Sequence, residues 1–454
     1  MAWDVVIAGG GFGGFYAART LERVLSPHSA RVTLVSDVNF LLFTPLLPGA
    51  AAGTLDPRHV VVPLREQLRR TDLWLGQVTG ADPERNVLVV ERAEAGRAAV
   101  GLGEEPGAEV ARDEGGRREL RYDQLIVALG SISRTRRVPG LVEHAIGFKT
   151  LADAIALRNR VIWMLEAAET IHDPQARAEY LTFVFVGAGY AGVEGLAELQ
   201  DFMSDVIDLY PRCRVQGMRW VLVEARERVM PEVAPSLAAF AERELRGRGI
   251  EIRTGTTIAE VSERSVRLSD GEPIGARTVV WTAGVRPHPV VARLGLPLSE
   301  AGRIEVDRTM RVRGRRNVWA IGDAAAVPDP ARRGEPSPPT AQHAIRQGRR
   351  VARNVAAELG AGGRVRPFGY RTLGVFVDLG RHQAVASTVG IRWRGFPAWF
   401  LARTYHLANM PGTKRKLRLV VDWTVALLFD RDTSELGQLG HPPGLEHIEE
   451  ETLA

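Results

Sequence analysis

The sequence has 454 residues, of which 45% are hydrophobic and 25% charged, and its formal net charge is +5. This length exceeds one ordinary hydrophobic core, so we expect two or three globular domains. The single cysteine, Cys213, excludes a disulfide within the chain and fits a reducing compartment. No zinc-type Cys/His spacing and no aromatic-basic module occur, so we predict no metal site and no nucleic-acid partner.

The chain begins directly with an expected strand, without a basic region, a long apolar run or a cleavage site. This start predicts no secretory signal. A transmembrane helix is not expected either, because it would need about 18 or more consecutive apolar residues. The arginines form either a solvated surface or, if they cluster, a contact for an anionic membrane.

A glycine cluster near the N-terminus has the pattern of a dinucleotide-binding turn. A buried strand over residues 5–8 is followed by Gly9, Gly11 and Gly14 in G-x-G-x-x-G spacing, and a helix is predicted over 15–25. The first glycine allows a tight turn, the second lets the backbone approach a pyrophosphate, and the third lets the helix pack against the strand. The positive end of the helix dipole would face the phosphates.

The acid expected after the second strand is displaced by one position. Residues 31–35 predict this strand, and an acid after it normally binds the ribose hydroxyls. Here Ser36 comes first and Asp37 follows. We predict that Asp37 binds the ribose, with Ser36 as a substitute, and the alternative is that Asp37 only begins a solvated turn.

Three stretches up to residue 150 shape the first part of the chain. Residues 40–48 are apolar but contain two prolines, which argue against a long helix, and they form either core or the wall of a flat aromatic cofactor. Residues 91–119 are rich in Gly, Glu and Arg, which predicts an exposed loop or a long hairpin. Residues 122–131 predict a buried strand with a small-residue turn. A domain crossing is expected near residue 150, before a helix over 151–167.

A second glycine fingerprint follows this crossing. A buried strand at 183–186 leads into Gly187, Gly189 and Gly192, and a strand at 220–223 ends on Glu224. Two fingerprints, each with its strand, helix and acid region, predict two dinucleotide-binding folds.

Glu224 bears on the choice of nucleotide. Its carboxylate attracts two ribose hydroxyls and repels a 2′-phosphate, which favours NADH over NADPH. Arg226 and Arg228 lie nearby and leave NADPH open.

Two later stretches, 278–284 and 317–325, read as apolar strands with small-residue ends. In the second, the strand is expected to run into a helix that starts at Gly322 and Asp323. There the Asp323 carboxylate would accept a hydrogen bond from a ribityl hydroxyl, while backbone N–H groups would face a pyrophosphate. The alternative is that Asp323 only caps the helix.

The order of these motifs resembles the flavoprotein reductases with two dinucleotide-binding domains: an FAD fingerprint, an ALG turn, a NAD fingerprint, a TAG turn and a GDAA motif. Within this superfamily the chain is most similar to type II NADH dehydrogenases, the single-subunit, non-proton-pumping NADH:quinone oxidoreductases. The similarity lies in residues 43–47, 122–131, 189–194, 281–287 and 339–348. The last stretch matches the family's AQ-x-A-x-Q-x-G helix, which approaches the flavin and the quinone.

The chain departs from the family pattern at two places. Ser36 stands where an acid usually follows the second strand, and this leaves the exact ribose contact open. Arg346 precedes Gln347 where the family often has two glutamines, and this leaves the quinone type open.

The resemblance implies an α/β fold with two Rossmann-like dinucleotide-binding domains and a C-terminal amphipathic, membrane-associating region. Residues 1–150 and 286–380 would bind FAD, and residues 151–285 would bind NADH. Residues 381–454 would serve membrane association or dimerisation.

The motifs and the resemblance together imply the contacts of each ligand. Those of FAD are Gly9, Gly11, Phe12, Gly14, Ser36, Asp37, Thr44, Pro45, Val78, Gly130, Gly322, Asp323, Ala341, Gln342 and His343. Those of NADH are Gly187, Gly189, Gly192, Glu194, Glu224, Ala283 and Gly284. Those of the quinone are Gln342, Arg346 and Gln347.

The resemblance also implies the reaction, in which NADH gives a hydride to FAD and the reduced flavin reduces a membrane quinone to quinol. Glu194 and Gln342 are the predicted catalytic residues. The alternatives are that Glu194 is a carboxylate at a helix dipole and that Gln342 faces the core. His343 is either a neutral packing side chain or a proton donor.

The C-terminal part combines basic residues with a helical apolar pattern. One helical face carries Leu417, Val420, Val421, Thr424 and Leu428. The pattern is typical of an interfacial membrane helix, and equally of a helix packed on its own domain or on a second subunit. Periodicity alone favours packing, whereas the resemblance favours membrane docking, because a lipid quinone must be reached from the bilayer.

The expected partners are therefore NADH, a membrane quinone and the membrane surface, with a homodimer left open. The expected location is peripheral, on the cytoplasmic face of the cell membrane. Two other functions remain: a soluble NAD(P)H-dependent flavin reductase that passes electrons to a protein, and an NADH-binding redox sensor. A disulfide reductase and a sulfide:quinone reductase are disfavoured, because both need paired cysteines.

Overall fold

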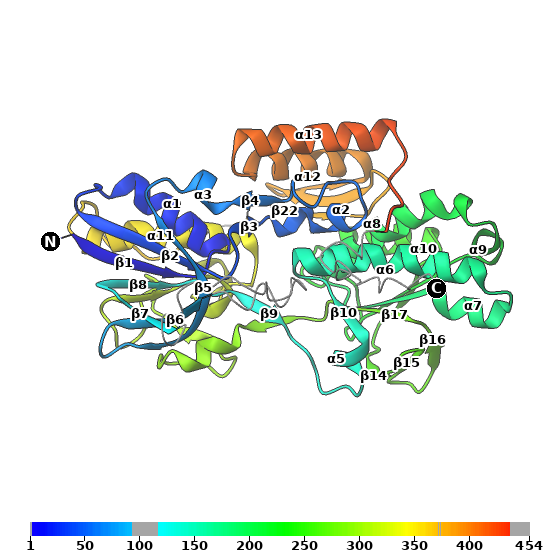
Figure 1. Ribbon diagram of the computed structural model, residues 1–454, viewed down its shortest axis with the longest axis horizontal. Coiled ribbons are helices and arrows are strands. Elements are labelled where there is room, and N and C mark those ends of the chain that lie inside the picture. The colour runs from blue at the N-terminus through cyan, green and yellow to red at the C-terminus, as the bar shows by residue number, and fades with distance from the viewer. Residues whose placement is uncertain (1, 93–116, 371, 373, 436–454) are drawn as a thin grey trace, which may run out of the picture.

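The first sheet has seven strands, in the order β20-β8-β1-β2-β5-β6-β7, and the computed structural model describes residues 2–92, 117–370, 372 and 374–435. Strands β20 to β5 pair in parallel, and β6 and β7 add an antiparallel edge. The strands are β1 (Trp3–Ala8), β2 (Ala30–Ser36), β5 (Asp72–Asp82), β6 (Val87–Arg92), β7 (Arg117–Arg121), β8 (Gln124–Val127) and β20 (Val318–Ala320). Because β20 joins the N-terminal strands, this half of the molecule is discontinuous in sequence (Figure 1).

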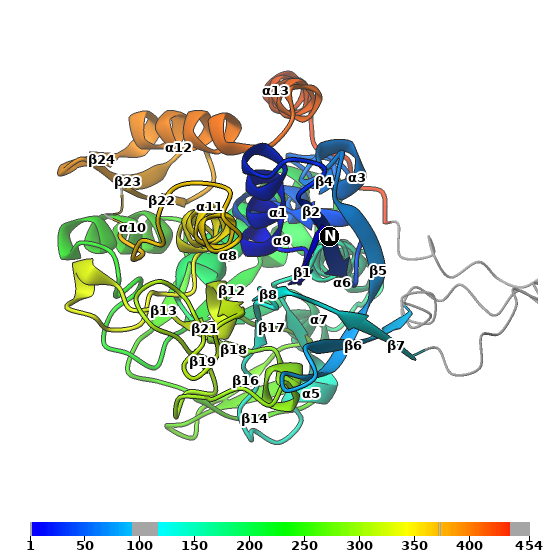
Figure 2. The same ribbon diagram turned by 90° about the vertical axis from the view of Figure 1, so that its left-hand side faces the viewer.

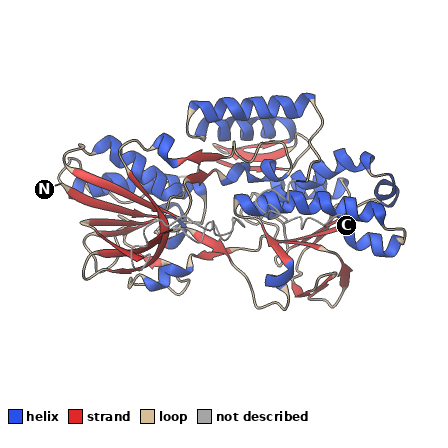
Figure 3. Cartoon of the chain, in the orientation of Figure 1, coloured by secondary structure: helices blue, strands red, loops and turns tan. Residues whose placement is uncertain are grey.

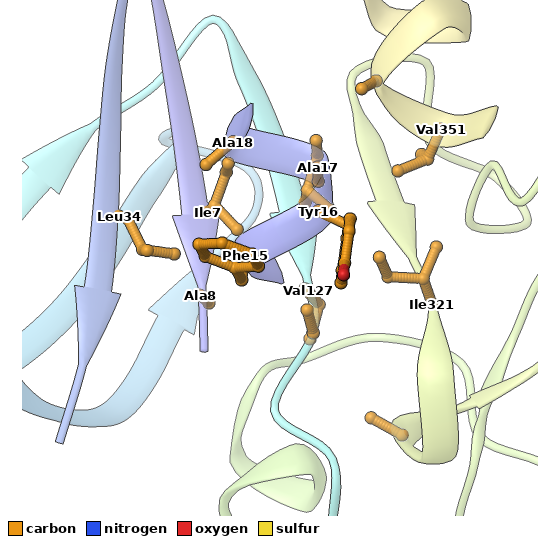
Figure 4. Packing of buried hydrophobic residues seen from close by; sticks show 14 of the residues in the cluster. Ile7, Ala8, Phe15, Tyr16, Ala17, Ala18, Leu34, Val127, Ile321 and Val351 are labelled. Atoms are coloured by element: carbon orange, nitrogen blue, oxygen red, sulfur yellow. The ribbon is translucent and has the colours of Figure 1, made fainter. Parts of the chain in front are cut away.

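Two helices cover one face of this sheet. Helix α1 (Phe12–Val24) starts at the first glycine turn, where Gly9 has a φ of +110° that a residue with a Cβ rarely adopts. Helix α11 (Ala341–Glu358) packs on α1 so closely that a Cβ on Gly348 would lie 2.3 Å from the carbonyl oxygen of Gly13. Figure 4 shows Ile7 and Phe15 packed together, with Ile321 and Val351 beyond Tyr16.

The second sheet has five parallel strands, in the order β10-β17-β11-β12-β13. Its three central strands, β17, β11 and β12, are mostly apolar and almost entirely buried, which is typical of a parallel sheet covered on both faces. The strands of this sheet are β10 (Ala145–Gly147), β11 (Thr182–Val186), β12 (Arg219–Val223), β13 (Glu251–Arg253) and β17 (Thr278–Trp281). The principal helices around it are α6 (Leu151–Thr170), α8 (Tyr190–Val206) and α10 (Pro235–Gly247).

A narrow antiparallel pair joins the two halves. Strand β9 (Ser131–Ser133) pairs with β18 (Val285–Pro287), so the chain crosses and returns at the same place. Helix α2 (Leu47–Ala51) adds a second connection, because it packs on α6 and α8 of the other half. The apolar stretch 40–48 is therefore partly interdomain core, and it forms no long helix.

The remaining elements are short and are coloured by type in Figure 3. The strands are β3 (Phe40–Leu42), β4 (Val61–Pro63), β14 (Ile258–Val261), β15 (Ser265–Leu268), β16 (Pro273–Gly275), β19 (Ile304–Glu305) and β21 (Ala325–Ala326). The helices are α3 (Leu64–Gln67), α5 (Leu141–His144), α7 (Pro174–Tyr180) and α9 (Pro211–Gln216).

The C-terminal region is a small layer of its own. An antiparallel sheet of β22 (Gly374–Asp378), β23 (Ala384–Thr388) and β24 (Ile391–Arg394) carries helix α12 (Gly395–Asn409), and α13 (Thr413–Leu428) follows. Figure 2 shows α13 end-on at the rim of the molecule. Within the described residues, no helix is long and apolar enough to cross a membrane.

Polar contacts fix the inner side of α13 to the first half. The Asp422 carboxylate accepts a hydrogen bond from the backbone N–H of Asp56 at 3.2 Å and contacts Nδ1 of His59 at 2.6 Å. Arg415 donates to the carbonyl of Arg58 at 2.6 Å. The outer side, with Leu417, Val421 and Leu428, is exposed. Within the described part of the chain, the predicted apolar face therefore does not pack on its own domain.

Two local predictions met different outcomes. The helix expected at Gly322 is wrong: Gly322–Ala324 forms one 3₁₀ turn, because Gly322 has a φ of +69° and the chain then enters β21, which pairs with β19. Within the predicted loop or hairpin at 91–119, the flanks pair as the antiparallel strands β6 and β7, and residues 93–116 lie outside the described residues.

Candidate active site

A cleft of about 1990 Å³ runs along the carboxyl ends of both parallel sheets. Its wall contains the residues that directly follow β1, β2, β8 and β20 in one half and β11, β12 and β17 in the other. This edge is where open α/β sheets bind ligands. Pockets for single drug-sized ligands measure roughly 300–1,000 Å³, so the cleft has room for more than one such molecule.

The first glycine turn leaves space at its centre. A Cβ on Gly11 would meet no atom of the described residues within 4 Å, so among them the backbone at the start of α1 is open to a phosphate. Ser36 also lines the cleft, and its buried hydroxyl has no hydrogen-bond partner among the described residues. Asp37 lines the cleft from an exposed position. Both candidates for a ribose contact are therefore present: the Asp37 carboxylate can accept from ribose hydroxyls, and the Ser36 hydroxyl can donate or accept, so these groups fit a dinucleotide.

Asp323 belongs to a polar chain that crosses between the two halves. Its carboxylate accepts a hydrogen bond from the Ser131 hydroxyl at 2.5 Å, and Nζ of Lys149 donates to the same hydroxyl at 2.9 Å. Burial lowers the pKa of Lys149, and the charge of Asp323 opposes this shift. The predictions from sequence missed Lys149, because it belongs to no motif and reaches Asp323 only through the fold.

The second glycine turn is organised in the same way. Gly187 has a φ of +104°, and a Cβ on Gly189 would meet no protein atom within 4 Å. One oxygen of the Glu224 carboxylate accepts a hydrogen bond from the backbone N–H of Ala188 at 2.7 Å. The other oxygen accepts one from the backbone N–H of Arg226 at 3.0 Å. The Glu224 side chain is thus fixed against the glycine turn.

Glu194 lies on α8 where the cleft approaches the C-terminal layer. Its carboxylate accepts a hydrogen bond from the backbone N–H of Asp378 at 3.1 Å. Burial, with the charges of Asp378 and Glu198, raises the pKa of Glu194 well above the ordinary range. This carboxyl therefore favours its protonated form, which a simple helix-dipole role would not require.

A small cavity of about 40 Å³ adjoins the cleft beneath α12 and α13. The two spaces share Glu194, Phe376 and His406 in their walls. Burial, together with the charge of Arg403, lowers the pKa of His406 to about 4, so this ring is neutral near pH 7. Arg403 lies between the rings of Trp399 and Trp423, at 4.3 and 5.0 Å from their centroids.

Helix α11 brings only one of its three predicted quinone contacts to the cleft. Gln342 lines it, with its side-chain oxygen accepting from the Tyr370 hydroxyl at 2.7 Å and its amide donating to the Gly374 carbonyl at 3.3 Å. Arg346 is outside the lining and stacks over the Tyr370 ring at 4.1 Å. Gln347 is 1% exposed and accepts a hydrogen bond from the backbone N–H of Gly322 at 2.7 Å.

His343 lines the cleft but both of its ring nitrogens have protein partners. Nδ1 contacts the Thr340 hydroxyl at 2.7 Å, and Nε2 lies 3.5 Å from a carboxylate oxygen of Asp329. Burial lowers the pKa of His343, against the opposing charge of Asp329. These contacts favour the packing role over proton donation.

The remaining predicted contacts divide into two groups. Those that line the cleft are Gly9, Phe12, Thr44, Pro45, Val78, Gly130, Gly322, Ala341, Ala283 and Gly284. Gly14 and Gly192 do not line it: a Cβ on either would lie 1.8 or 1.9 Å from the carbonyl oxygen of the first glycine of its own turn. These two glycines therefore let the helices pack on the turns, as the spacing predicts.

Comparisons with known proteins agree with this geometry. The model of the pyridine nucleotide-disulphide oxidoreductase family matches residues 3–348. A type II NADH:quinone oxidoreductase of Mycobacterium tuberculosis is 32% identical over 445 residues, covering 94% of this chain and 88% of that protein. A demethylphylloquinone reductase of Synechocystis is 28% identical, over 94% of this chain and 96% of that protein.

The fold comparison leads to the same group of proteins. NDH2 from Plasmodium falciparum in complex with NADH superimposes with a TM-score of 0.85 at 18% identity, covering 96% of this chain and 100% of that chain. The predicted α/β fold with two Rossmann-like halves is thereby confirmed. Cys213 is buried in α9 and does not line the cleft. The chain belongs to the pyridine nucleotide-disulphide oxidoreductase family and, within it, to the type II NADH:quinone oxidoreductases.

Proposed function

We propose that this protein oxidises NADH and reduces a membrane quinone to quinol, with FAD bound between the two steps. The observation that carries the proposal is the cleft, which contains both glycine turns and continues past Glu194 towards the C-terminal layer. The overall reaction takes up one proton for each NADH and quinone consumed. The site must therefore hold two nucleotides, admit a quinone and supply a proton.

The first half supplies the groups that would hold FAD. The open backbone at Gly11 would face its pyrophosphate, Ser36 and Asp37 would contact its ribose, and Asp323 would contact its ribityl chain. Bound there, FAD supplies the two-electron chemistry that links a hydride donor to a quinone. We assign this role to residues 1–150 and 286–380.

Residues 151–285 bind NADH in the proposal. Gly189 leaves room for the pyrophosphate, and Glu224 lies where the adenosine ribose hydroxyls would be recognised. Ala283 and Gly284, at the end of β17, complete the wall towards the other half.

Glu194 and Gln342 are the proposed catalytic residues. The raised pKa of Glu194 favours its protonated form, and the residue borders both the cleft and the small cavity beneath α12 and α13. A raised pKa keeps this carboxyl protonated, and so able to donate a proton, to a higher pH than an ordinary glutamate. Gln342 lines the same cleft, and its side-chain oxygen accepts a hydrogen bond from the Tyr370 hydroxyl.

Within residues 381–454, helix α13 is the proposed contact with the membrane. Leu417, Val421 and Leu428 on α13 are 65%, 52% and 72% exposed. Lys414, Lys416 and Arg418 stand beside them in sequence, and such a basic apolar helix is typical of an interfacial anchor. NADH is a cytoplasmic reductant, so we place this contact on the cytoplasmic face of the membrane. The other occupant of this surface would be a second copy of the chain.

Anaerobic half-reactions test the proposal. NADH should bleach the yellow colour of the purified protein rapidly, and a short-chain quinone should restore it within the time of one turnover. If the colour returned only with a ferredoxin-type protein, the hypothesis of a soluble flavin reductase that passes electrons to a protein would replace the quinone proposal. A stable charge-transfer complex that no acceptor discharges would favour the redox sensor.

A further inference from the structure

The loop over residues 224–233 follows β12, lines the NADH half of the cleft and carries Glu224 and Glu232. What we infer about Glu232 rests on the proposed function, because it concerns the nucleotide that this half would bind. Arg228 donates to the carbonyls of Pro231 and Val233, at 2.7 and 3.1 Å, on either side of Glu232. Met230 is buried, and its backbone N–H donates to the carbonyl of Ala188 in the second glycine turn at 2.8 Å. Glu232 is therefore carried by a loop whose backbone is anchored to the nucleotide turn.

The carboxylates of this loop disfavour a 2′-phosphate on the bound nucleotide. Glu232 lies 3.5 Å from the guanidinium of Arg226, and both side chains line the cleft beside Glu224. The backbone N–H of Arg226 donates to Glu224 at 3.0 Å, so Arg226 stands directly next to the expected ribose contact. An arginine at this place is what dinucleotide folds use to accept a 2′-phosphate.

Both arginines that left NADPH open in the sequence have oxygen partners in the structure. The Arg228 guanidinium donates hydrogen bonds to two backbone carbonyls of its own loop. Arg226 is paired with Glu232. A 2′-phosphate adds about 1.5 to 2 negative charges at neutral pH, so it would have to displace a carboxylate from Arg226 and then lie near two carboxylates.

We infer that Glu232 is a second specificity residue for the nucleotide: it rejects a 2′-phosphate through its own charge and by occupying Arg226. Glu224 accepts hydrogen bonds from the ribose hydroxyls, and Glu232 pairs with the Arg226 guanidinium, which could otherwise bind a 2′-phosphate. Arg228 is a positioning residue, because it fixes the backbone on both sides of Glu232.

The chain offers a matched control for this inference. Glu227 belongs to the same loop and is exposed, but it does not line the cleft. Glu227→Gln therefore makes the same change in net charge without touching the Arg226–Glu232 pair. The double variant Arg226→Ala/Glu232→Gln removes both partners and tests whether any gain depends on the freed arginine.

The test is calorimetric titration of the flavin-loaded protein with ADP-ribose and with 2′-phospho-ADP-ribose, two probes that carry no nicotinamide. Glu232→Gln should tighten 2′-phospho-ADP-ribose about tenfold more than it tightens ADP-ribose, a difference of roughly 1.4 kcal/mol. Glu227→Gln should leave this ratio unchanged, and the double variant should lose most of the gain. The NADPH-to-NADH ratio of kcat/KM should rise in parallel.

Two results would overturn the inference: an unchanged ratio in Glu232→Gln, or an equal gain in Glu227→Gln, which would reduce the effect to overall charge. Failure of the unaltered protein to bind ADP-ribose at all would instead overturn the proposed function on which the inference rests. The two failures are thus distinguished within one set of titrations.

Discussion

The side-chain oxygen of Gln347 accepts a hydrogen bond from the backbone N–H of Gly322 at 2.7 Å. The contact joins α11 to the turn after β20, and that turn carries Asp323 into the cleft. Gln347 is thus linked to the proposed flavin site through the backbone, and it does not line the cleft itself.

Replacing Gln347 by leucine should weaken the flavin site while leaving recognition of the quinone intact. The half-buried N–H of Gly322 would lose its partner, at a cost of about 1 kcal/mol in stability. We expect a lower FAD content and a lower Tm, with an unchanged KM for a short-chain quinone in the molecules that keep FAD. Gln342→Ala is the comparison, because Gln342 lines the cleft and its loss should raise that KM. A raised KM in Gln347→Leu with full FAD content would contradict this assignment.

A side chain at position 348 should force α11 away from α1. The Cβ of an alanine there would lie 2.3 Å from the carbonyl oxygen of Gly13, so Gly348→Ala should cost about 1–3 kcal/mol of unfolding free energy. Gly247→Ala, near the end of α10, is a suitable control, because its Cβ would meet no protein atom within 4 Å. Urea denaturation measures both, and equal midpoints in the two variants would show that the helices adjust freely.

Three carboxyls with raised pKa values, one buried and two half-buried, should make the protein less stable as the pH rises. Burial raises the pKa values of Glu194, Glu198 and Asp378, so the folded state binds more protons than the unfolded state between the ordinary pKa and the raised one. Their contribution is complete below the unfolded pKa, near 4, and is lost as the pH rises through the folded value.

Glu198→Gln should reduce this loss of stability, since an amide does not ionise. Over pH 5 to 8 we expect the decline in unfolding free energy to become shallower by roughly 1–3 kcal/mol, whereas Glu300→Gln at an exposed loop position should change nothing. Thermal unfolding at a series of pH values measures the slopes. Identical slopes for Glu198→Gln and the unaltered protein would contradict the burial argument.

The sequence predicts the two halves well because their signals are local. Each fingerprint places its strand, glycine turn and helix within about 25 consecutive residues. The strand residues that precede each glycine turn are apolar, which predicts a buried parallel strand. The helix expected at Gly322 failed because it depended on a distant partner: β21 pairs with β19, and this pairing takes the chain out of the turn.

The residues around α11 show where a motif stops being informative. The AQ-x-A-x-Q-x-G pattern predicts a helix near the cleft, but it does not state which side of the helix faces the ligand. Ala344, Gly348 and Val351 recur at helical spacing and mark the packed side, and Gln347 lies among them. That periodicity could have separated Gln347 from Gln342. Lys149 had no such signal, because only the assembled fold brings it to Ser131.

The exposed apolar face of α13 should govern membrane binding. The triple change Leu417→Ser, Val421→Ser and Leu428→Ser should weaken binding to anionic vesicles by more than about tenfold, because each substitution removes roughly 1 kcal/mol or more of apolar burial. Val215→Ser on α9, at a position 90% exposed, is the control. Turnover with a short-chain quinone should stay the same in both variants.

Sedimentation of the same variants separates the two occupants of this surface. If the triple change dissociated a dimer while vesicle binding persisted, the face would lie between copies of the chain and the membrane contact would have to be sought elsewhere.

The central claim is that electrons pass from NADH to a quinone, and steady-state oxidation of NADH by the flavin-loaded protein tests it most directly. The assay follows NADH loss and quinol formation with a short-chain quinone, with NADPH in a parallel reaction. We predict rapid turnover with NADH, one quinol per NADH, and much slower turnover with NADPH. Rapid reduction of the flavin without any quinol formed would contradict the account.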